Sequence, residues 1–94
     1  MGQDITKHNP DSLNLTNLSS GDECLLVLHN DDFNTFAFVI ESLIAVCGHD
    51  PVQAEQCALI THHQGECDIK RGEVAAIKPM QQGLLYRGLL VTIE

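Results

Sequence analysis

Residues 24–29, CLLVLH, form a nearly continuous apolar run that ends at three polar residues, Asn30, Asp31 and Asp32. An apolar run this short, bounded by turn-forming residues, is typical of a strand buried on both faces. Asn and Asp favour turns because their side chains compete for backbone hydrogen-bond donors. The sequence therefore predicts a central buried strand that ends in a sharp polar turn.

Two helices are predicted after this turn. The first covers 35–47, where apolar residues recur at steps of three and four positions, and Asn34 is its predicted N-cap. The second covers 51–64, because Asp50 suits an N-cap and Pro51 suits the first helical position. Both helices have one apolar face and are therefore expected to cover a sheet.

The last third of the chain predicts two further strands and one helix. Residues 66–70 alternate imperfectly, as in an edge strand, and 89–93 suit a final strand. A third helix is predicted over 72–87, with Pro79 expected to kink or split it. The predicted fold is α+β in the order β-α-α-β-α-β: a three-stranded antiparallel sheet with three helices on one face.

Composition indicates one small domain and excludes some partners. The polar residues 1–22 predict a mobile N-terminal tail, and 23–94 form the predicted domain. Thirteen acidic and five basic residues give a net charge of −8, which argues against nucleic-acid binding because phosphates need clustered Lys and Arg. No apolar run reaches the roughly 20 residues that cross a bilayer. The N-terminus lacks the apolar segment of a secretory signal, so the expected location is cytoplasmic.

Four cysteines leave several interpretations open. In a reducing compartment they are expected to be free thiols or small buried hydrophobes, with two disulfides as the weaker alternative. A small metal-binding protein built on Cys57, His62 and Cys67 is a lesser alternative, since the spacing fits no established zinc pattern. No catalytic motif is present, so no catalytic residue is assigned and an enzyme is not expected.

Four segments together resemble one protein family. Residues 28–40, LHNDDFNTFAFVI, resemble the L-x-N-D-D-[YF]-T-P-M-E-F-V pattern of the ClpS family, adaptors that deliver proteins with bulky hydrophobic N-termini to a Clp protease. Residues 58–65, ALITHHQG, resemble that family's M-L-x-V-H-x-x-G. Residues 73–78, EVAAIK, resemble E-V-A-x-x-K, and 88–94, GLLVTIE, resemble P-L-x-x-T-[LI]-E. The resemblance covers about residues 25–94 and implies a small ClpS-like sandwich.

The resemblance implies a site for an N-terminal residue, which offers one ammonium group and one side chain. It implies that Asn30, Asp31 and His62 hold the α-amino group and that Asp32 adds negative potential. The chemistry agrees, because these side chains can accept hydrogen bonds from an ammonium. A pocket beneath would take the first side chain. Its lining positions would be Asn34, Phe36, Val39, Ala58, Thr61 and Leu89.

The resemblance also implies a partner. Glu73 and Lys78 match positions that contact the N-domain of the Clp ATPase, and no cofactor or metal is implied. The chain departs from the family near this surface. The link before the third helix is about two residues shorter, and Pro79 interrupts that helix. Docking to the ATPase is therefore less firmly implied than the pocket.

The pocket itself departs from the family pattern at three positions. Ala58 and Phe36 stand where the family has Met, which enlarges the floor and fills space at the mouth. Thr61 stands where the family has Val, and its hydroxyl costs free energy unless it finds a partner. We expect a pocket that accepts aromatic first residues at least as well as Leu. The alternative is the same fold with a remodelled pocket for a different ligand or partner.

Overall fold

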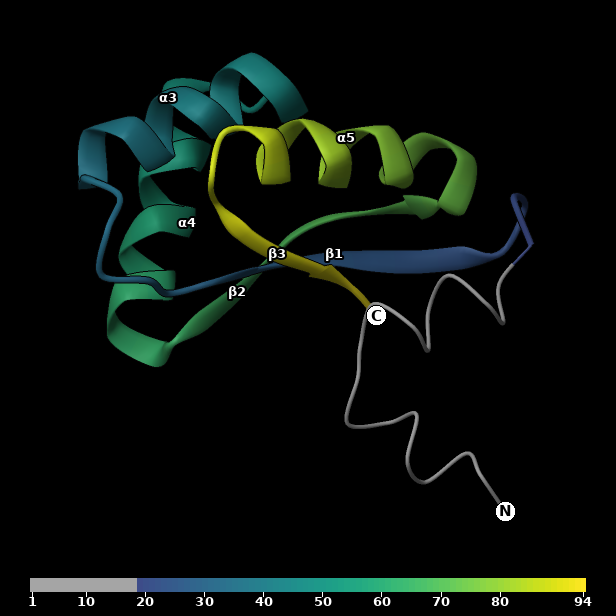
Figure 1. Cartoon of the computed structure of the whole chain (residues 1–94), viewed down its shortest axis with the longest axis horizontal. Helices are drawn as coiled ribbons and strands as arrows, with labels where there is room; N and C mark the ends of the chain where they lie inside the picture. The colour runs from purple at the N-terminus through teal and green to yellow at the C-terminus, as the bar shows by residue number, and fades with distance from the viewer. Residues whose placement is uncertain (1–18) are drawn as a thin grey trace.

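The computed structural model describes residues 19–94. Three helices lie on one face of a three-stranded sheet, as Figure 1 shows. The elements follow in the order β1 (Glu23–His29), α3 (Phe36–Cys47), α4 (Pro51–Gln64), β2 (Glu66–Glu73), α5 (Val74–Tyr86) and β3 (Leu90–Ile93). This is the predicted β-α-α-β-α-β order, so the α+β fold class is confirmed.

The apolar strand β1 is the centre of the sheet. The strand order is β2-β1-β3 and both pairings are antiparallel. His29 at the end of β1 pairs with Glu66 on one side and Leu90 on the other, so three strands meet where β1 enters the polar turn. The prediction that β2 is an edge strand is confirmed, although it continues three residues past the predicted end at residue 70.

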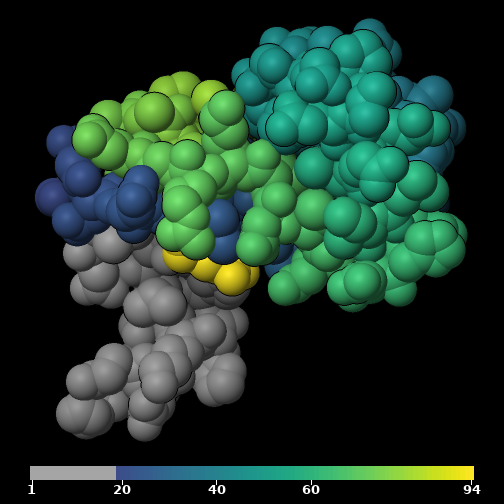
Figure 2. Space-filling view, turned by 180° about the vertical axis from the view of Figure 1, so that it is seen from behind, coloured from purple at the N-terminus to yellow at the C-terminus, as the bar shows by residue number. Residues whose placement is uncertain are grey.

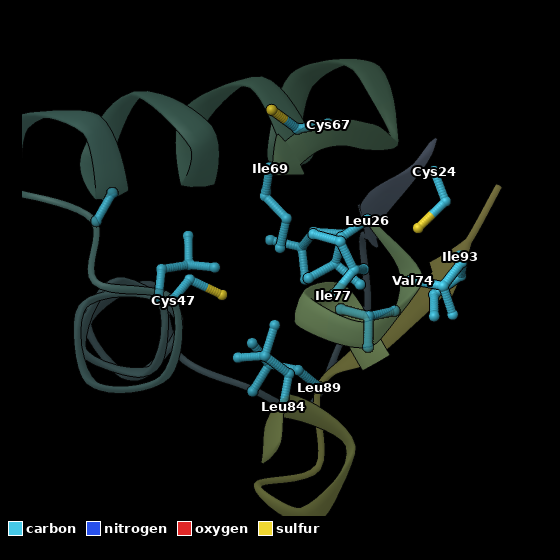
Figure 3. Packing of buried hydrophobic residues seen from close by; sticks show 14 residues of the cluster. Cys24, Leu26, Cys47, Cys67, Ile69, Val74, Ile77, Leu84, Leu89 and Ile93 are labelled. Atoms are coloured by element: carbon cyan, nitrogen blue, oxygen red, sulfur yellow. The ribbon is translucent and has the colours of Figure 1, made fainter. Parts of the chain in front are cut away.

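The core lies between the sheet and the helices (Figure 3). Leu26 and Leu28 of β1 pack there with Leu43 of α3 and with Ile77 and Leu84 of α5, and all five are essentially inaccessible to solvent. Because alternate residues of a strand point to one face, these two leucines are the helix-facing residues of the run. A core of this composition fixes the strand register, since a slip by one residue would turn both leucines away from the helices.

The first predicted cap is wrong and the second is confirmed. Thr35, not Asn34, is the N-cap of α3: its backbone is extended and its hydroxyl accepts a hydrogen bond from the Phe38 N–H at 3.1 Å. Both residue types can cap a helix, and Asn34 makes other contacts. Asp50 caps α4 as predicted, with its carboxylate accepting from the Gln53 N–H at 2.8 Å.

Helix α5 does not split at Pro79, contrary to one of the two expected outcomes. It continues through the proline to Tyr86. Proline removes one backbone donor, whose partner would be the carbonyl of Ala75, and Ala75 is exposed, so water can satisfy that carbonyl. Burial of Ile77 and Leu84 on the core side compensates for the lost hydrogen bond.

Residues 19–22 form a turn that is bonded to the start of α5. The Val74 N–H donates to the Asp22 carbonyl at 2.9 Å, and the Ala75 N–H donates to the Ser20 carbonyl at 3.0 Å. Figure 2 shows this turn, in purple and blue, beside the green residues that lead into α5. The predicted tail covers residues 1–22, and residues 1–18 of it lie outside the described part of the chain. Within residues 19–94, no helix is long and apolar enough to cross a membrane.

Helices α3 and α5 approach closely at Gly83. A Cβ atom at this position would lie 2.9 Å from Cγ1 of Val46, closer than real Cβ atoms come to a neighbour. Val46 is β-branched, so its side chain has little rotamer freedom within a helix. The missing side chain of Gly83 therefore sets the distance between the two helices.

We predict that Gly83→Ala destabilises the protein although alanine favours helices. The helix gains about 1 kcal/mol from the better helix former. Overpacking against Val46 costs about 1–3 kcal/mol. Urea denaturation should therefore show a lower free energy of unfolding. In a Val46→Ala background the clash is gone, and the same change should instead stabilise. A gain in stability with Val46 present would contradict this account.

Candidate functional site

A cavity of about 430 Å³ lies where β1 ends, beside the start of α3 and the second half of α4. Polar side chains come from the loop after β1, and apolar side chains come mainly from the two helices. The lining residues are Leu28, His29, Asn30, Asp31, Asp32, Asn34, Phe36, Val39, Ala58, Thr61 and His62. The structure thus brings together nine of the ten residues that the sequence placed in the amine site and pocket.

The Asp31 carboxylate organises the loop between β1 and α3. Its Oδ1 accepts hydrogen bonds from the N–H groups of Phe33, at 2.9 Å, and Asn34, at 2.8 Å. Its Oδ2 accepts from Nδ2 of Asn34 at 3.0 Å. This arrangement holds the residues after Asp31 in a tight turn. Each carboxylate oxygen has more than one lone pair, so Asp31 can accept further hydrogen bonds.

Asn34 connects the same loop to the start of β3, at the same end of the sheet. Its Nδ2 also donates to the carbonyl of Gly88 at 3.0 Å, in the turn that joins α5 to β3. Gly88 has a φ of 89°, a left-handed conformation that favours glycine. Asn34 therefore fixes the loop in two directions, which explains why this residue does not cap α3.

The environment of Asp31 keeps its carboxylate ionised. Partial burial alone would raise its pKa, but the hydrogen bonds from backbone and side chain of Asn34 and from the Phe33 N–H outweigh burial and lower the pKa below its ordinary value. Asp32 is exposed and follows directly, so the mouth of the cavity carries two neighbouring negative charges. A cation would be attracted to this position.

The end of α4 is tied to the end of β1, which brings His62 to the same mouth. The Asn30 N–H donates to the carbonyl of Gly65 at 2.8 Å, and Gly65 ends α4 in a left-handed conformation with a φ of 92°. His62 is exposed and lines the cavity. The ring of His63 stands 5.3 Å from that of His62, edge to face, but His63 is not among the lining residues.

The floor of the cavity is apolar, and its one hydroxyl has a partner. Ala58 is 3% exposed and Thr61 is 5% exposed, both on the face of α4 that carries His62. The Thr61 hydroxyl donates to the Cys57 carbonyl at 2.8 Å, which removes the cost expected for an unpaired hydroxyl. Phe36, 41% exposed, stands at the start of α3, and Val39 lies one turn further on.

Leu89 is the one expected pocket residue that does not line the cavity. It is 3% exposed and belongs to the hydrophobic core, where Figure 3 draws it next to Leu84. The Leu89 N–H also donates to the Leu84 carbonyl at 3.0 Å, which turns the chain from α5 into β3. The sequence placed Leu89 at the pocket, whereas its side chain packs in the interior.

Glu73 and Lys78 lie apart from the cavity lining. Glu73 is both the last residue of β2 and the N-cap position of α5, so no loop separates the two elements, in agreement with the short link in the sequence. Its side chain makes no capping hydrogen bond and is exposed. Lys78 is exposed on α5. Both side chains are therefore accessible to a partner.

Two lining residues, Leu28 and His29, were missed because they belong to the strand rather than to the polar turn. His29 is hydrogen-bonded through Nε2 to the Thr92 hydroxyl at 2.8 Å, and its Nδ1 lies 3.5 Å from the Glu66 carboxylate. These contacts join β1 to both neighbouring strands. The signal in the sequence was the position of His29 immediately before Asn30.

The structure shows neither disulfides nor a metal-ligand cluster at the cysteines of the described residues 19–94. All four cysteines are free. Burial raises the pKa of Cys47 to about 11 and that of Cys67 to about 12, so both thiols stay protonated and poorly nucleophilic. In the part of the chain from residue 19 onward, no three His, Cys, Asp or Glu side chains gather as metal ligands. Cys57, His62 and Cys67 therefore form no such cluster.

The chain is similar to known Clp protease adaptor proteins in sequence. The family model for the ATP-dependent Clp protease adaptor protein ClpS matches residues 20–87. The Clp protease adapter of Nitratidesulfovibrio vulgaris is 40% identical over 55 residues, which cover 56% of this chain and 55% of that protein. The adapter of Pectobacterium carotovorum is 38% identical over 75 residues, which cover 73% of this chain and 71% of that protein.

A solved structure has the same fold. The structure of Agrobacterium tumefaciens ClpS2 bound to L-phenylalaninamide matches with a TM-score of 0.70 at 20% identity, over 79% of this chain and 96% of that chain. The chain spans about half the length of the Nitratidesulfovibrio relative, 55%, and 71% of the length of the Pectobacterium relative. The family match extends from the turn at residue 20 to the end of α5, across both the loop of Asp31 and the cavity. The chain is a member of the ClpS family of Clp protease adaptor proteins.

Proposed function

We propose that this protein binds segments of other proteins that begin with a free, bulky hydrophobic residue and delivers them to a Clp ATPase-protease, without catalysing a reaction itself. One observation carries the proposal. Hydrogen-bond acceptors from Asn30, Asp31 and His62 gather at the mouth of a cavity whose floor is apolar. A chain terminus presents the matching pair of groups, a cation with three donors and a side chain.

The mouth suits an ammonium group because its acceptors and charges are already in place. The Asp31 carboxylate is fixed by its own hydrogen bonds and keeps free lone pairs. A charge-assisted hydrogen bond contributes about 1.5–3 kcal/mol, more than a neutral one. We propose that Asn30, Asp31 and His62 bind the amine and that Asp32 adds attraction.

The floor suits a large apolar side chain. Burial of a Leu or Phe side chain contributes about 1.5–3 kcal/mol. The proposed contacts are Phe36, Val39, Ala58 and Thr61, together with Asn34 at the rim. The A. tumefaciens ClpS2 structure supports this assignment, because its ligand, L-phenylalaninamide, is a free-amine phenylalanine. Leu89 is left out of the proposed site, since it packs in the core.

We further propose that Glu73 and Lys78 contact the N-domain of the Clp ATPase. Both side chains are exposed at the start of α5 and lie outside the cavity lining. Peptide binding and docking would then use separate surfaces. A bound substrate segment could therefore remain in place while the adaptor docks.

We predict that a peptide with a free N-terminal Phe binds at least tenfold more tightly than its N-acetylated twin, because acetylation removes the cation. Fluorescence anisotropy with dye at the peptide's far end measures both affinities. Asp31→Asn should weaken binding of the free peptide and leave the acetylated one unchanged.

Asp68→Asn is the matched control, since it removes one exposed negative charge from β2 outside the cavity. Because the acetylated peptide would still use the apolar floor, an unchanged affinity for it shows that the Asp31→Asn variant keeps the cavity. Equal affinity for free and blocked peptides would contradict the proposed function and favour a pocket remodelled for another ligand.

We predict that peptide affinity falls as the pH is lowered from 7.5 to 5.5. A neutral imidazole has one acceptor nitrogen, whereas a protonated imidazole has only donors and repels an ammonium. Asp31 cannot cause this fall. Its lowered pKa means that it stays ionised throughout this range, and its contribution to the loop is lost only at more acidic pH.

The pH titration needs variants that separate the histidines near the cavity. His62→Gln should weaken binding at pH 7.5 and flatten the profile, while His63→Gln should leave the profile as it is, because His63 does not line the cavity. His29, beside Glu66, also lines the cavity and remains in both variants. A profile that stays steep in His62→Gln would rule out His62 as the source of the pH dependence.

We predict that Ala58→Met changes the preferred first residue. The longer side chain fills part of the floor, so aromatic N-termini should lose about tenfold or more in affinity while Leu loses less. Ala45→Met, on an exposed position of α3, is the control for the substitution itself. A wild-type series that ranks Leu far above Phe, Tyr and Trp would contradict the account of the floor.

A further inference from the structure

Phe33 is the most exposed large hydrophobic side chain in the described part of the chain. It is 95% exposed, although the protein has only three phenylalanines. A ring surrounded by water adds nothing to the stability of the fold, because it buries no apolar surface. The fold therefore gives no reason for an aromatic residue at this position.

The loop holds Phe33 in a fixed place. Its backbone N–H donates to Oδ1 of Asp31 at 2.9 Å, and Asn34 is bonded to both Asp31 and Gly88. These contacts involve the backbone of Phe33 and the side chains of its neighbours, and none depends on the ring. An aromatic group on a constrained loop loses little conformational freedom when it binds another surface.

The position of Phe33 is at the rim of the cavity. Its two neighbours in sequence, Asp32 and Asn34, line the cavity, while Phe33 itself does not. The backbone of Phe33 is therefore held next to the mouth, and its exposed ring is not part of the cavity lining. A peptide whose first side chain fills the cavity must leave through this mouth, and its second Cα lies only about 3.8 Å from the first.

We propose that Phe33 contacts the side chain of the second residue of the bound segment and makes the protein prefer an apolar, above all aromatic, residue there. This inference rests on the proposed function, because it requires the first residue to occupy the cavity. Aromatic side chains attract each other beyond the effect of buried area, in offset or edge-to-face arrangements. The cavity thus selects the first residue and Phe33 selects the second.

The test compares peptides that begin with free Phe and differ only at the second position, with Ala, Leu or Phe. Wild-type protein should bind the Phe-Phe and Phe-Leu peptides about two- to tenfold more tightly than Phe-Ala, as measured by fluorescence anisotropy. Phe33→Ala should bind all three alike, with the affinity of wild type for Phe-Ala. Phe33→Trp should keep the preference.

Val52→Ala is the matched control. Val52 is 68% exposed at the first turn of α4, and His62 lies ten residues further along the helix, about 15 Å away. This variant should keep the wild-type preference. Because Phe33 is exposed and only its backbone is hydrogen-bonded, Phe33→Ala is expected to melt at the wild-type temperature, which circular dichroism checks.

The outcomes separate the two proposals. If wild type distinguishes free from acetylated peptides but binds the three second residues alike, the role of Phe33 is overturned and the proposed function stands. A preference that survives in Phe33→Ala also overturns it. If free and acetylated peptides bind alike, the proposed function itself fails.

Discussion

The carboxylate of Asp31 is the contact on which the candidate site depends. It accepts three hydrogen bonds, one from the Phe33 N–H and two from the backbone N–H and the side-chain amide of Asn34. These bonds hold the loop between β1 and α3 in place, together with the contact of Asn34 with the Gly88 carbonyl. The same group supplies charge at the mouth of the cavity. Its structural role and its proposed binding role therefore rest on the same side chain.

The cavity is built by joining separate ends of the fold. The Asn30 N–H is bonded to Gly65, so the last turn of α4 lies against the end of β1. Helix α3 begins at the same place, after the cap at Thr35. The loop between β1 and α3 therefore supplies most of the polar groups, and helices α3 and α4, which also cover the core, supply most of the apolar floor. This division lets the mouth be polar without placing an unpaired polar group in the interior.

Much of the fold could be predicted, because hydrophobic periodicity and strong caps such as Asp50 act locally. The predictions for Asn34 and Leu89 were wrong because contacts with residues distant in sequence, or with a neighbouring turn, determine where these side chains lie. Asn is the better N-cap by type, so the sequence favours Asn34 over Thr35, but the contact of Asn34 with Gly88 leaves the cap to Thr35. Leu89 points into the core because the chain folds back onto Leu84. The exposure of Phe33 is likewise invisible in a sequence, where an aromatic residue is ordinarily expected to be buried.

Thr61 shows how one hydrogen bond can shape selectivity. Its proton is engaged by the Cys57 carbonyl, so the hydroxyl oxygen can still receive a hydrogen bond but has none to give. An incoming side chain whose tip carries a donor, as the phenol of tyrosine does, would meet a compatible lone pair. A side chain that ends in acceptors only would lose its hydrogen bonds to water and would find no donor at Thr61. At Thr61 the cavity can therefore accept a hydrogen bond but cannot donate one, and a valine at this position could do neither.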